Sequence, residues 1–369
     1  MCRFLIFVLA WLSLVASVPA ADSSSIDSLR LLEGATGATV ARQVLQQAVA
    51  EGATNLLPVL NAFQGATPLG ANWLRNAFET IAAAESRSGR ELPARELISF
   101  ILDTKNSAAA RRLAYEWMLK QDPTLEERII PGLLQDAHPA FRRDAVTRLI
   151  VQAQSSEGEQ ALQLYRTAIQ GAVDKDQVAI VADALKAAGD PVDLQMHFGF
   201  LSEWKIIGPF DNREMKGYFV DYAPESEVDL TSTYDGQLGT VGWNHITTDD
   251  DYGIINIGDQ IKNYKGSLMY ASTTFRSADP QDVEFRLGTP NAWKLWVNGK
   301  LVFEREEYHR STRMDQFRIP LSLQAGDNLI LLKVCQNEQE EDWAQDYKFQ
   351  LRVCSSSGQG ILSTGENND

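Results

Sequence analysis

The sequence lacks most of the motifs on which enzyme chemistry depends. It contains no H-E-x-x-H, C-x-x-C, G-x-S-x-G or P-loop sequence, and its four histidines are scattered without metal-ligand spacing. We therefore predict a non-catalytic protein. A glycoside-acting enzyme stays as the third alternative, because glycoside hydrolysis needs only two well-placed carboxylates and the chain has 49 acidic residues.

Positive charge is also scarce. Lys and Arg number 34 against 49 Asp and Glu, so the formal net charge is −15. A surface this acidic repels phosphate backbones and anionic lipid, which predicts that neither nucleic acid nor a membrane surface is a partner. No segment after the N-terminus has the run of about 20 apolar residues that a membrane span needs, so we also predict no membrane insertion.

The N-terminus has the pattern of a targeting segment. Arg3 is followed by the apolar stretch "FLIFVLAWLSLV" and then by small residues at Val18-Pro19-Ala20. Cys2 precedes the apolar stretch, whereas the acylated cysteine of a lipoprotein follows it, so we do not expect Cys2 to be acylated. We predict that residues 1–20 are a signal peptide and that the protein is exported, either to a periplasm or out of the cell.

Two cysteines, Cys335 and Cys354, remain after that segment, and each ends a predicted strand. If the two strands pair as an antiparallel hairpin, their C-terminal ends lie roughly 20 Å apart at about 3.4 Å per residue. A disulfide requires Cα atoms within about 7 Å. The sequence therefore predicts two unbridged thiols.

The first half of the chain, residues 26–190, predicts α-helices with a weak internal repeat. Ala77, Ala114 and Ala145 each follow a basic residue by two or three positions and precede an apolar turn, at spacings of 37 and 31, and Ala182 follows after 37 more. Such a period is typical of stacked helix pairs, in which a small residue lets neighbouring helices approach closely. The run "HPAFRRDAVTRLI" resembles a HEAT repeat, and an irregular helical bundle is the alternative.

The second half, residues 198–356, predicts an antiparallel β-sandwich or barrel. Short alternating runs such as "VEFRLG" and "FQLRV" are separated by Gly, Asn, Asp and Pro. The fold class is thus α plus β with two domains. Residues 357–369 are polar and lack aromatic side chains, which predicts a disordered tail.

The stretch "WKLWVNGKLVFE" predicts a β-hairpin that turns at Asn298-Gly299. Side chains alternate between the two faces of a strand, so Trp293 and Trp296 point to opposite faces. Trp293 falls with the core residues. Trp296 falls with Asn298 on an outer or concave face, where both are candidate ligand contacts.

This hairpin, with "WKIIGPFDN" before it and "LQAGDNLILLKVC" after it, resembles the galactose-binding-like jelly roll of secreted bacterial proteins. The resemblance covers residues 198–356. It implies a module that binds carbohydrate, sometimes with a structural calcium, or one that serves in protein interactions. Binding residues of that superfamily lie on variable loops, so the resemblance assigns none here.

The loop "EREEYHRSTRMDQ" is the most mixed segment of the β half and supplies the other candidate ligand contacts, Tyr308, His309, Arg310 and Arg313. They combine aromatic rings with planar guanidinium groups that donate several hydrogen bonds, a combination that favours sugar binding. A loop whose cations pair with its own glutamates is the alternative.

Two acidic clusters, "TTDDDYG" and "NEQEEDWAQD", offer oxygen ligands without the spacing of a known calcium loop. A structural calcium is therefore not supported by spacing, and we predict no cofactor and no metal site.

These features favour an exported, non-catalytic binding protein in which a helical scaffold carries a β-sandwich module for a glycan or cell-surface polymer. The alternative is a structural or assembly protein that uses both domains for protein–protein contacts.

Overall fold

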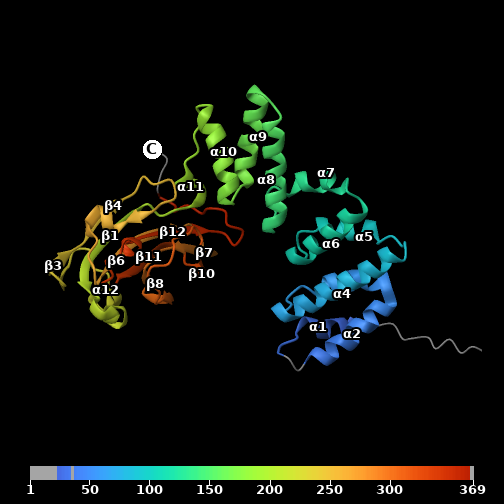
Figure 1. Ribbon diagram of the computed structural model, residues 1–369, viewed down its shortest axis with the longest axis horizontal. Helices are drawn as coiled ribbons and strands as arrows, with labels where there is room; N and C mark the ends of the chain where they lie inside the picture. The colour runs from blue at the N-terminus through green and yellow to red at the C-terminus, as the bar shows by residue number, and fades with distance from the viewer. Residues whose placement is uncertain (1–22, 35–36, 366–369) are drawn as a thin grey trace, which may run out of the picture. The chain divides into compact units, whose positions relative to one another are not determined.

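The computed structural model describes residues 23–34 and 37–365 of the chain (Figure 1). The predicted signal peptide, residues 1–20, lies outside the described residues. Helices run to Phe198 and antiparallel strands follow from Glu203 to Cys354, which confirms the α plus β class. The chain divides into two compact units between Phe141 and Arg142, so the last helices before the strands belong to the second unit.

The helices have caps and prolines at several of their ends. Pro68 and Pro139 each occupy the first position of a helix, and Thr67 caps the first of these by accepting a hydrogen bond from the Gly70 backbone. None of the described helices is long and apolar enough to cross a membrane. The helices of the first half are α1 Ser23–Arg30, α2 Ala38–Glu51, η2 Gly52–Asn55, α3 Leu56–Asn61, α4 Pro68–Arg87, α5 Ala94–Leu102, α6 Ala108–Gln121, α7 Leu125–Ile129, η3 Ile130–Leu133, α8 Pro139–Gln154, α9 Gly158–Gly171, α10 Lys175–Ala187 and α11 Leu194–Phe198.

The repeated alanines occupy equivalent places in this series. Ala77, Ala114, Ala145 and Ala182 lie on α4, α6, α8 and α10, which are alternate long helices, and all four are buried. Neighbouring helices pack as pairs, with α5 against α6 and α9 against α10. The four alanines therefore lie in the interior of the helical region, and a HEAT-like repeat stays a prediction.

A buried ion pair ties part of the first unit together. The Arg111 guanidinium on α6 donates two hydrogen bonds to the Asp136 carboxylate at 3.1 and 2.7 Å, and a third to the Ile101 carbonyl at 2.6 Å. Both charged side chains are almost fully buried. A two-pronged pair of this kind fixes the geometry between helix and loop, and removal of one partner would leave an uncompensated buried charge.

The second half forms two main antiparallel sheets and a small two-stranded one, β2–β3 (Figure 1). The larger sheet has the strand order β4-β1-β6-β11-β8-β9, and the smaller has β10-β7-β12-β5. The strands are β1 Glu203–Asp211, β2 Thr233–Gly236, β3 Gly239–Gly242, β4 Asn244–Thr247, β5 Ile255–Asn256, β6 Ser267–Ser277, β7 Gln281–Gly288, β8 Ala292–Val297, β9 Lys300–Arg305, β10 Phe317–Leu323, β11 Gly326–Gln336 and β12 Lys348–Cys354. The short helices between them are η4 Arg213–Phe219, α12 Ala223–Ser226, η5 Gly258–Lys262 and η6 Asp342–Ala344.

The main core lies between the two sheets. Trp293 of β8, fully buried, stacks on Phe303 with ring centroids 5.1 Å apart. It shares one apolar cluster with residues of both sheets, including Phe285 of β7 and Leu351 of β12. The predicted alternation of β7 and β12 is therefore confirmed, and so is the hairpin, whose turn residues Asn298 and Gly299 have positive φ.

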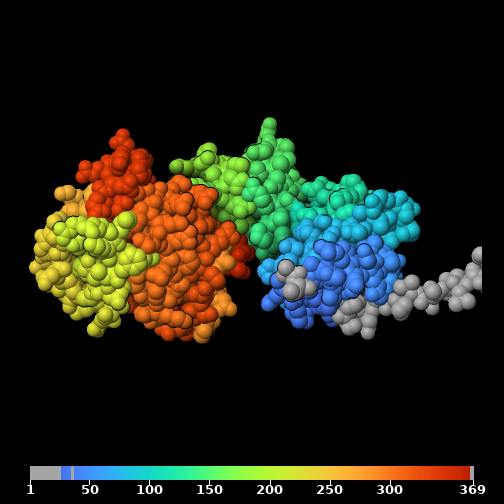
Figure 2. Space-filling view, turned by 60° about the horizontal axis from the view of Figure 1, so that its bottom comes forward, coloured from blue at the N-terminus to red at the C-terminus, as the bar shows by residue number. Residues whose placement is uncertain are grey.

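Trp296 has the predicted face but not the predicted exposure. It points away from the main core into a second apolar cluster with Phe210, Tyr218 and Leu331, and only 7% of its surface is exposed. The segment from Arg213 to Gly242 supplies Tyr218, Val228, Tyr234 and Val241 to this cluster, so it covers the outer face of the larger sheet. We call this segment the cover; it forms the yellow-green to yellow part of the β-region surface in Figure 2. The expectation that Trp296 lies on an outer or concave face that is at least partly open is wrong about the exposure, because alternation specifies a face and not what lies over it.

The two cysteines are free and buried, but the reasoning that predicted this was wrong in one step. Cys335 ends the β11 core run in the larger sheet, between β6 and β8, whereas Cys354 ends β12 in the smaller sheet. The predicted β11–β12 hairpin does not form, because each strand pairs with strands far from it in the sequence.

The chain after β12 also differs from its prediction. Residues 357–365, for which composition predicts disorder, hydrogen-bond back to the sandwich: the Ile361 amide donates to the Val353 carbonyl at 2.9 Å, and the Thr364 amide donates to the Arg276 carbonyl at 2.8 Å. Residues 366–369 lie outside the described part of the chain. Composition missed these contacts because backbone groups make them.

Candidate functional site

Two loops of the β region line a surface groove of about 1250 Å³ that is open to solvent. One follows β9 and carries three of the predicted site residues. The other follows β11 and is the second acidic cluster. The lining consists of Met215, Tyr308, His309, Arg310, Asn337, Glu338, Gln339, Glu340, Glu341 and Trp343.

Trp343 is the exposed aromatic ring of this groove. It lies on the short helix η6 with 61% of its surface exposed. Its neighbour Ala344 is fully buried, and the Ala344 carbonyl accepts hydrogen bonds from the Lys265 ammonium at 2.9 Å and from the Gln336 side chain at 3.3 Å. The ring is therefore held out to solvent on an anchored backbone, which lowers the entropy lost when a ligand binds to it.

His309 fixes the orientation of that ring from the opposite loop. Its Nε2 lies 2.6 Å from the Asn337 Oδ1, and its ring meets the Trp343 ring edge-on with centroids 5.2 Å apart. An edge-to-face pair leaves one indole face unused by the contact. The two loops are thus joined directly by His309 across the groove.

The groove concentrates backbone strain. Non-glycine residues with positive φ are uncommon, and the described residues include Glu214, Met215, Asn298, His309 and Asp315 in that conformation. Met215 and His309 line the groove, and the Glu214 amide beside them donates to the Glu338 carboxylate. Such strain collects at binding sites, where the surrounding contacts hold the chain in place.

Tyr308 contributes a polar group at the base of the groove. Its hydroxyl accepts a hydrogen bond from the Asn212 side chain at 3.2 Å. Burial, followed by the neighbouring Cys335, raises the pKa of the Tyr308 phenol above its usual range. The hydroxyl therefore stays protonated at neutral pH and is available as a hydrogen-bonding group instead of a charge.

The charge of the groove is predominantly negative. Glu338, Glu340 and Glu341 line it, and the last two make no ion pair within residues 23–34 and 37–365. Arg310 is the main cation, and its guanidinium lies 3.4 Å from the Glu307 carboxylate of its own loop. Arg310 therefore pairs with a glutamate of its own loop, as the alternative interpretation of that loop expects. Glu340 and Glu341 remain as hydrogen-bond acceptors for a ligand.

The other predicted ligand contacts lie elsewhere. Trp296 is buried beneath the cover, and only a small cavity of about 240 Å³ reaches it. Asn298 forms the hairpin turn, where its amide group donates to Asn328 at 3.0 Å and accepts from the Leu329 amide at 2.9 Å. Arg313 lines a separate cavity with Lys175 and Arg318. The structure thus brings together Tyr308, His309 and Arg310, and separates the remaining three.

The acidic clusters show no metal-binding geometry in the described chain. No group of three or more His, Cys, Asp or Glu side chains is arranged to hold a metal ion among residues 23–34 and 37–365. Asp250 of the first cluster accepts hydrogen bonds from the backbone amides of Tyr252 and Ile254 at 2.9 and 3.2 Å. Its carboxylate therefore shapes its own loop.

The sequence did not lead us to predict Trp343 as a site residue, although it lies in the second acidic cluster. Tryptophan is rare on an exposed loop, and a single indole within the charged run "NEQEEDWAQD" has no apolar neighbours to form a core stripe. That isolation was the available signal for a surface ring.

Comparisons with known proteins assign no family. No protein-family model matches the chain, and no curated protein matches it in sequence. Some solved structures resemble parts of it. A β-glucosidase from Kluyveromyces marxianus in complex with glucose matches 41% of this chain and 16% of its own, at 10% identity and a TM-score of 0.27.

A β-glucuronidase from Faecalibacterium prausnitzii matches 37% of this chain and 21% of its own, at 13% identity and a TM-score of 0.24. An alkylpurine DNA glycosylase from Pseudomonas fluorescens bound to DNA matches 93% of this chain and 81% of its own, at 14% identity and a TM-score of 0.20. At such scores these similarities carry no argument about the function of this chain.

Proposed function

We propose that this protein is an exported, non-catalytic glycan-binding protein and that the groove around Trp343 is its binding site. Its helical half would be a HEAT-like scaffold and its β half a galactose-binding-like module. The observation that carries the proposal is the exposed Trp343 ring, held by His309 and an anchored backbone in a groove that glutamate side chains also line.

The aromatic ring and the acceptors suit the two kinds of surface on a sugar. The C–H face of a pyranose is apolar and packs on an indole, whereas its equatorial hydroxyls donate hydrogen bonds at the ring edge. Glu340 and Glu341 offer carboxylate oxygens for those hydroxyls. Because these carboxylates repel anions, the ligand of this groove should be a neutral glycan.

The shape of the groove favours a polymer. It is open to solvent and does not enclose its occupant. A chain of several sugar units could lie across it and leave at both ends, whereas a small metabolite would remain largely solvated. A cell-surface or extracellular polysaccharide therefore fits better than a free monosaccharide.

A glycan array of neutral and acidic saccharides, probed with the full chain, tests the proposal. The matched variants are Trp343→Ala and Trp117→Ala, the latter removing a partly exposed tryptophan from α6. We expect neutral glycans to bind wild type and Trp117→Ala, and to be lost from Trp343→Ala. A blank array, or equal signals from both variants, would contradict it and favour the assembly protein.

A further inference from the structure

A second cavity of the β region differs from the groove in both position and charge. It has a volume of about 550 Å³, within the range of about 300–1,000 Å³ that is typical of small-molecule sites. Its walls come from the loop before α10, the loop before β5, the loop before β10, and the strands β10 and β12. The lining residues are Val173, Asp174, Lys175, Tyr252, Ile254, Thr312, Arg313, Met314, Asp315, Arg318, Lys348 and Gln350.

The floor of this cavity is the outer face of the smaller sheet, where three arginines stand in one row. Arg318 of β10 is opposite Arg286 of β7, which is opposite Arg352 of β12. The Asp315 carboxylate accepts hydrogen bonds from Arg286 at 2.7 Å and from Arg352 at 2.6 Å. Arg286 also pairs with the Glu284 carboxylate at 2.8 Å, so Asp315 and Glu284 together balance two arginines of the row, whereas Arg318 pairs with neither.

Asp315 is held as an anion by these contacts. Burial alone would raise its pKa, but hydrogen bonds from Arg352 and Arg286 outweigh that effect and lower the pKa below its usual range. Asp174, the other carboxylate of the lining, lies 2.9 Å from the Arg143 guanidinium. Both carboxylates of the cavity are therefore already paired with cations outside its lining.

The cations of the lining, in contrast, are mostly unpaired. Within residues 23–34 and 37–365, Arg313 and Arg318 form no ion pair. The Lys175 ammonium lies 3.8 Å from the centre of the Tyr252 ring, and Lys348 lies 2.9 Å from Asp346. In a chain of net charge −15, two arginines without a carboxylate partner at one cavity are unexpected. They create a positive potential that favours an anionic ligand.

A buried amide at the floor adds a second requirement. The Gln350 side chain is 4% exposed, and its Oε1 has no hydrogen-bond partner in the described part of the chain. A buried acceptor without a donor is destabilising, and a hydroxyl group of a ligand would satisfy it. The Thr312 hydroxyl, also in the lining, is likewise buried and without a partner among these residues.

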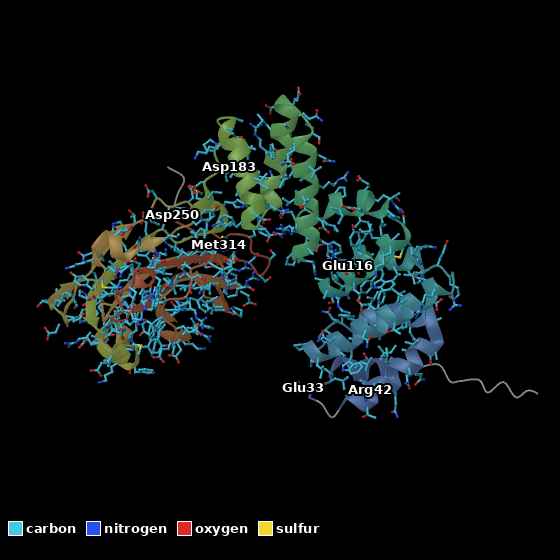
Figure 3. The ribbon with its side chains drawn as sticks, viewed as in Figure 1. Glu33, Arg42, Glu116, Asp183, Asp250 and Met314 are labelled. Atoms are coloured by element: carbon cyan, nitrogen blue, oxygen red, sulfur yellow. The ribbon has the colours of Figure 1, made fainter. Side chains whose placement is uncertain are left out.

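The charges around the cavity also give the ligand a direction. Burial, then the charges of Asp251, Asp183 and Asp250, raise the pKa of the Tyr252 phenol, and the Lys175 ammonium lies 3.8 Å from the centre of the Tyr252 ring, so charges of both signs surround this side of the cavity. Figure 3 labels Asp183, Asp250 and Met314 in this part of the molecule. An anionic group would therefore lie near Arg313 and Arg318, and the uncharged part of the ligand would lie near Tyr252.

We propose that this cavity binds a sugar acid, a hydroxylated ligand that carries one carboxylate, such as a uronic acid. The carboxylate pairs with Arg318 and Arg313, whose planar guanidinium groups match its two oxygens, and a ligand hydroxyl donates to the Gln350 oxygen. The site is independent of the groove around Trp343, which is acidic and suits neutral sugars.

Isothermal titration calorimetry of the full chain at low ionic strength tests this inference with D-galacturonate and D-glucuronate. Their methyl esters keep the hydroxyls and remove the charge, and sodium sulfate keeps a charge without the sugar. We expect at least one uronate to bind, and its ester and sulfate to bind at least tenfold more weakly. Failure of both uronates to bind would overturn the proposal, as would sulfate or an ester that binds equally well.

Variants locate the site. Arg318 is exposed, so Arg318→Gln should leave the fold intact and weaken uronate binding at least tenfold. Gln350→Leu should weaken uronate binding and leave sulfate binding unchanged. Arg276→Gln, which removes an exposed arginine elsewhere on the sandwich, is the matched control and should bind like wild type, as should Trp343→Ala. Uronate binding that survives Arg318→Gln unchanged would place the ligand elsewhere and overturn the assignment.

Discussion

The covered face around Trp296 and the open groove around Trp343 adjoin strands of the same six-stranded sheet. Trp296 is nevertheless only 7% exposed, whereas Trp343 is 61% exposed. The cover, residues Arg213–Gly242, accounts for the first value, since its side chains pack on Trp296. The ring of Trp343 stands on a loop that turns outward after β11. The comparison teaches that strand position determines the direction of a side chain, and that a distant segment decides whether it meets solvent.

The largest expected effects are on the two tryptophans of β8. Trp293→Ala should destabilise the protein by about 3–5 kcal/mol, as truncation of a buried aromatic does. Trp296→Ala should fall near the lower end of the same range of about 3–5 kcal/mol, because a cavity already borders its ring. Denaturant melts of both variants measure the difference. A loss below about 1 kcal/mol for Trp296→Ala would mean that the cover does not pack on it in solution.

The anchoring of the cover gives the next effect. Lys333 of β11 is fully buried, and its ammonium donates to the Glu225 carboxylate of α12 at 2.7 Å and to the Val220 carbonyl at 2.8 Å. Glu225→Gln removes the counter-charge, so we expect a loss of about 3 kcal/mol. Glu227→Gln, an exposed change on the same segment, is the control and should stay within about 0.5 kcal/mol of wild type.

A smaller effect is expected from the two thiols. Cys335→Ser places a hydroxyl in the apolar cluster beneath the cover, at a cost of about 1–3 kcal/mol. Cys354→Ser should cost less, because the Cys354 Sγ already lies 3.5 Å from the Glu284 carbonyl, which would accept a hydrogen bond from the serine hydroxyl. Thermal melts of the two variants rank them, and the reverse order would contradict the assignment of Cys335 to the covered face.

The reactivity of Cys335 provides an independent check of the cover. Burial raises the pKa of this thiol to about 12, so almost none of it is thiolate at pH 8. A thiol reagent should therefore label it only after unfolding, and should then find both cysteines free without added reductant. Rapid labelling of Cys335 in the native protein would show that the cover opens.

Local patterns were enough to predict part of this structure. The Asn298-Gly299 turn follows from the backbone conformations that these residues permit, and the inward faces of β7 and β12 follow from two-residue alternation. The helical character of the first half follows from apolar residues at helical spacing and from prolines at helix starts.

Contacts between distant segments could not be predicted in this way. Strand β11 pairs with β6 and β8 instead of β12, and no residue within β11 encodes that choice. The cover has no sustained periodic pattern, because Tyr218 lies in the short helix η4 and Val228 lies in irregular chain. Trp343 was hidden for the same reason, since an acidic run is normally interpreted as solvated chain.

The central claim is that Trp343, and not Trp296, presents the ligand-binding ring. Its most direct test is a titration of wild type and Trp343→Ala with the best neutral glycan from the array, together with a thermal melt. We expect the variant to bind with a loss of about 2 kcal/mol or more, roughly thirtyfold in Kd, as for an exposed aromatic anchor. Because the ring is largely exposed, its stability should stay within about 0.5 kcal/mol of wild type. An unchanged Kd would contradict the account.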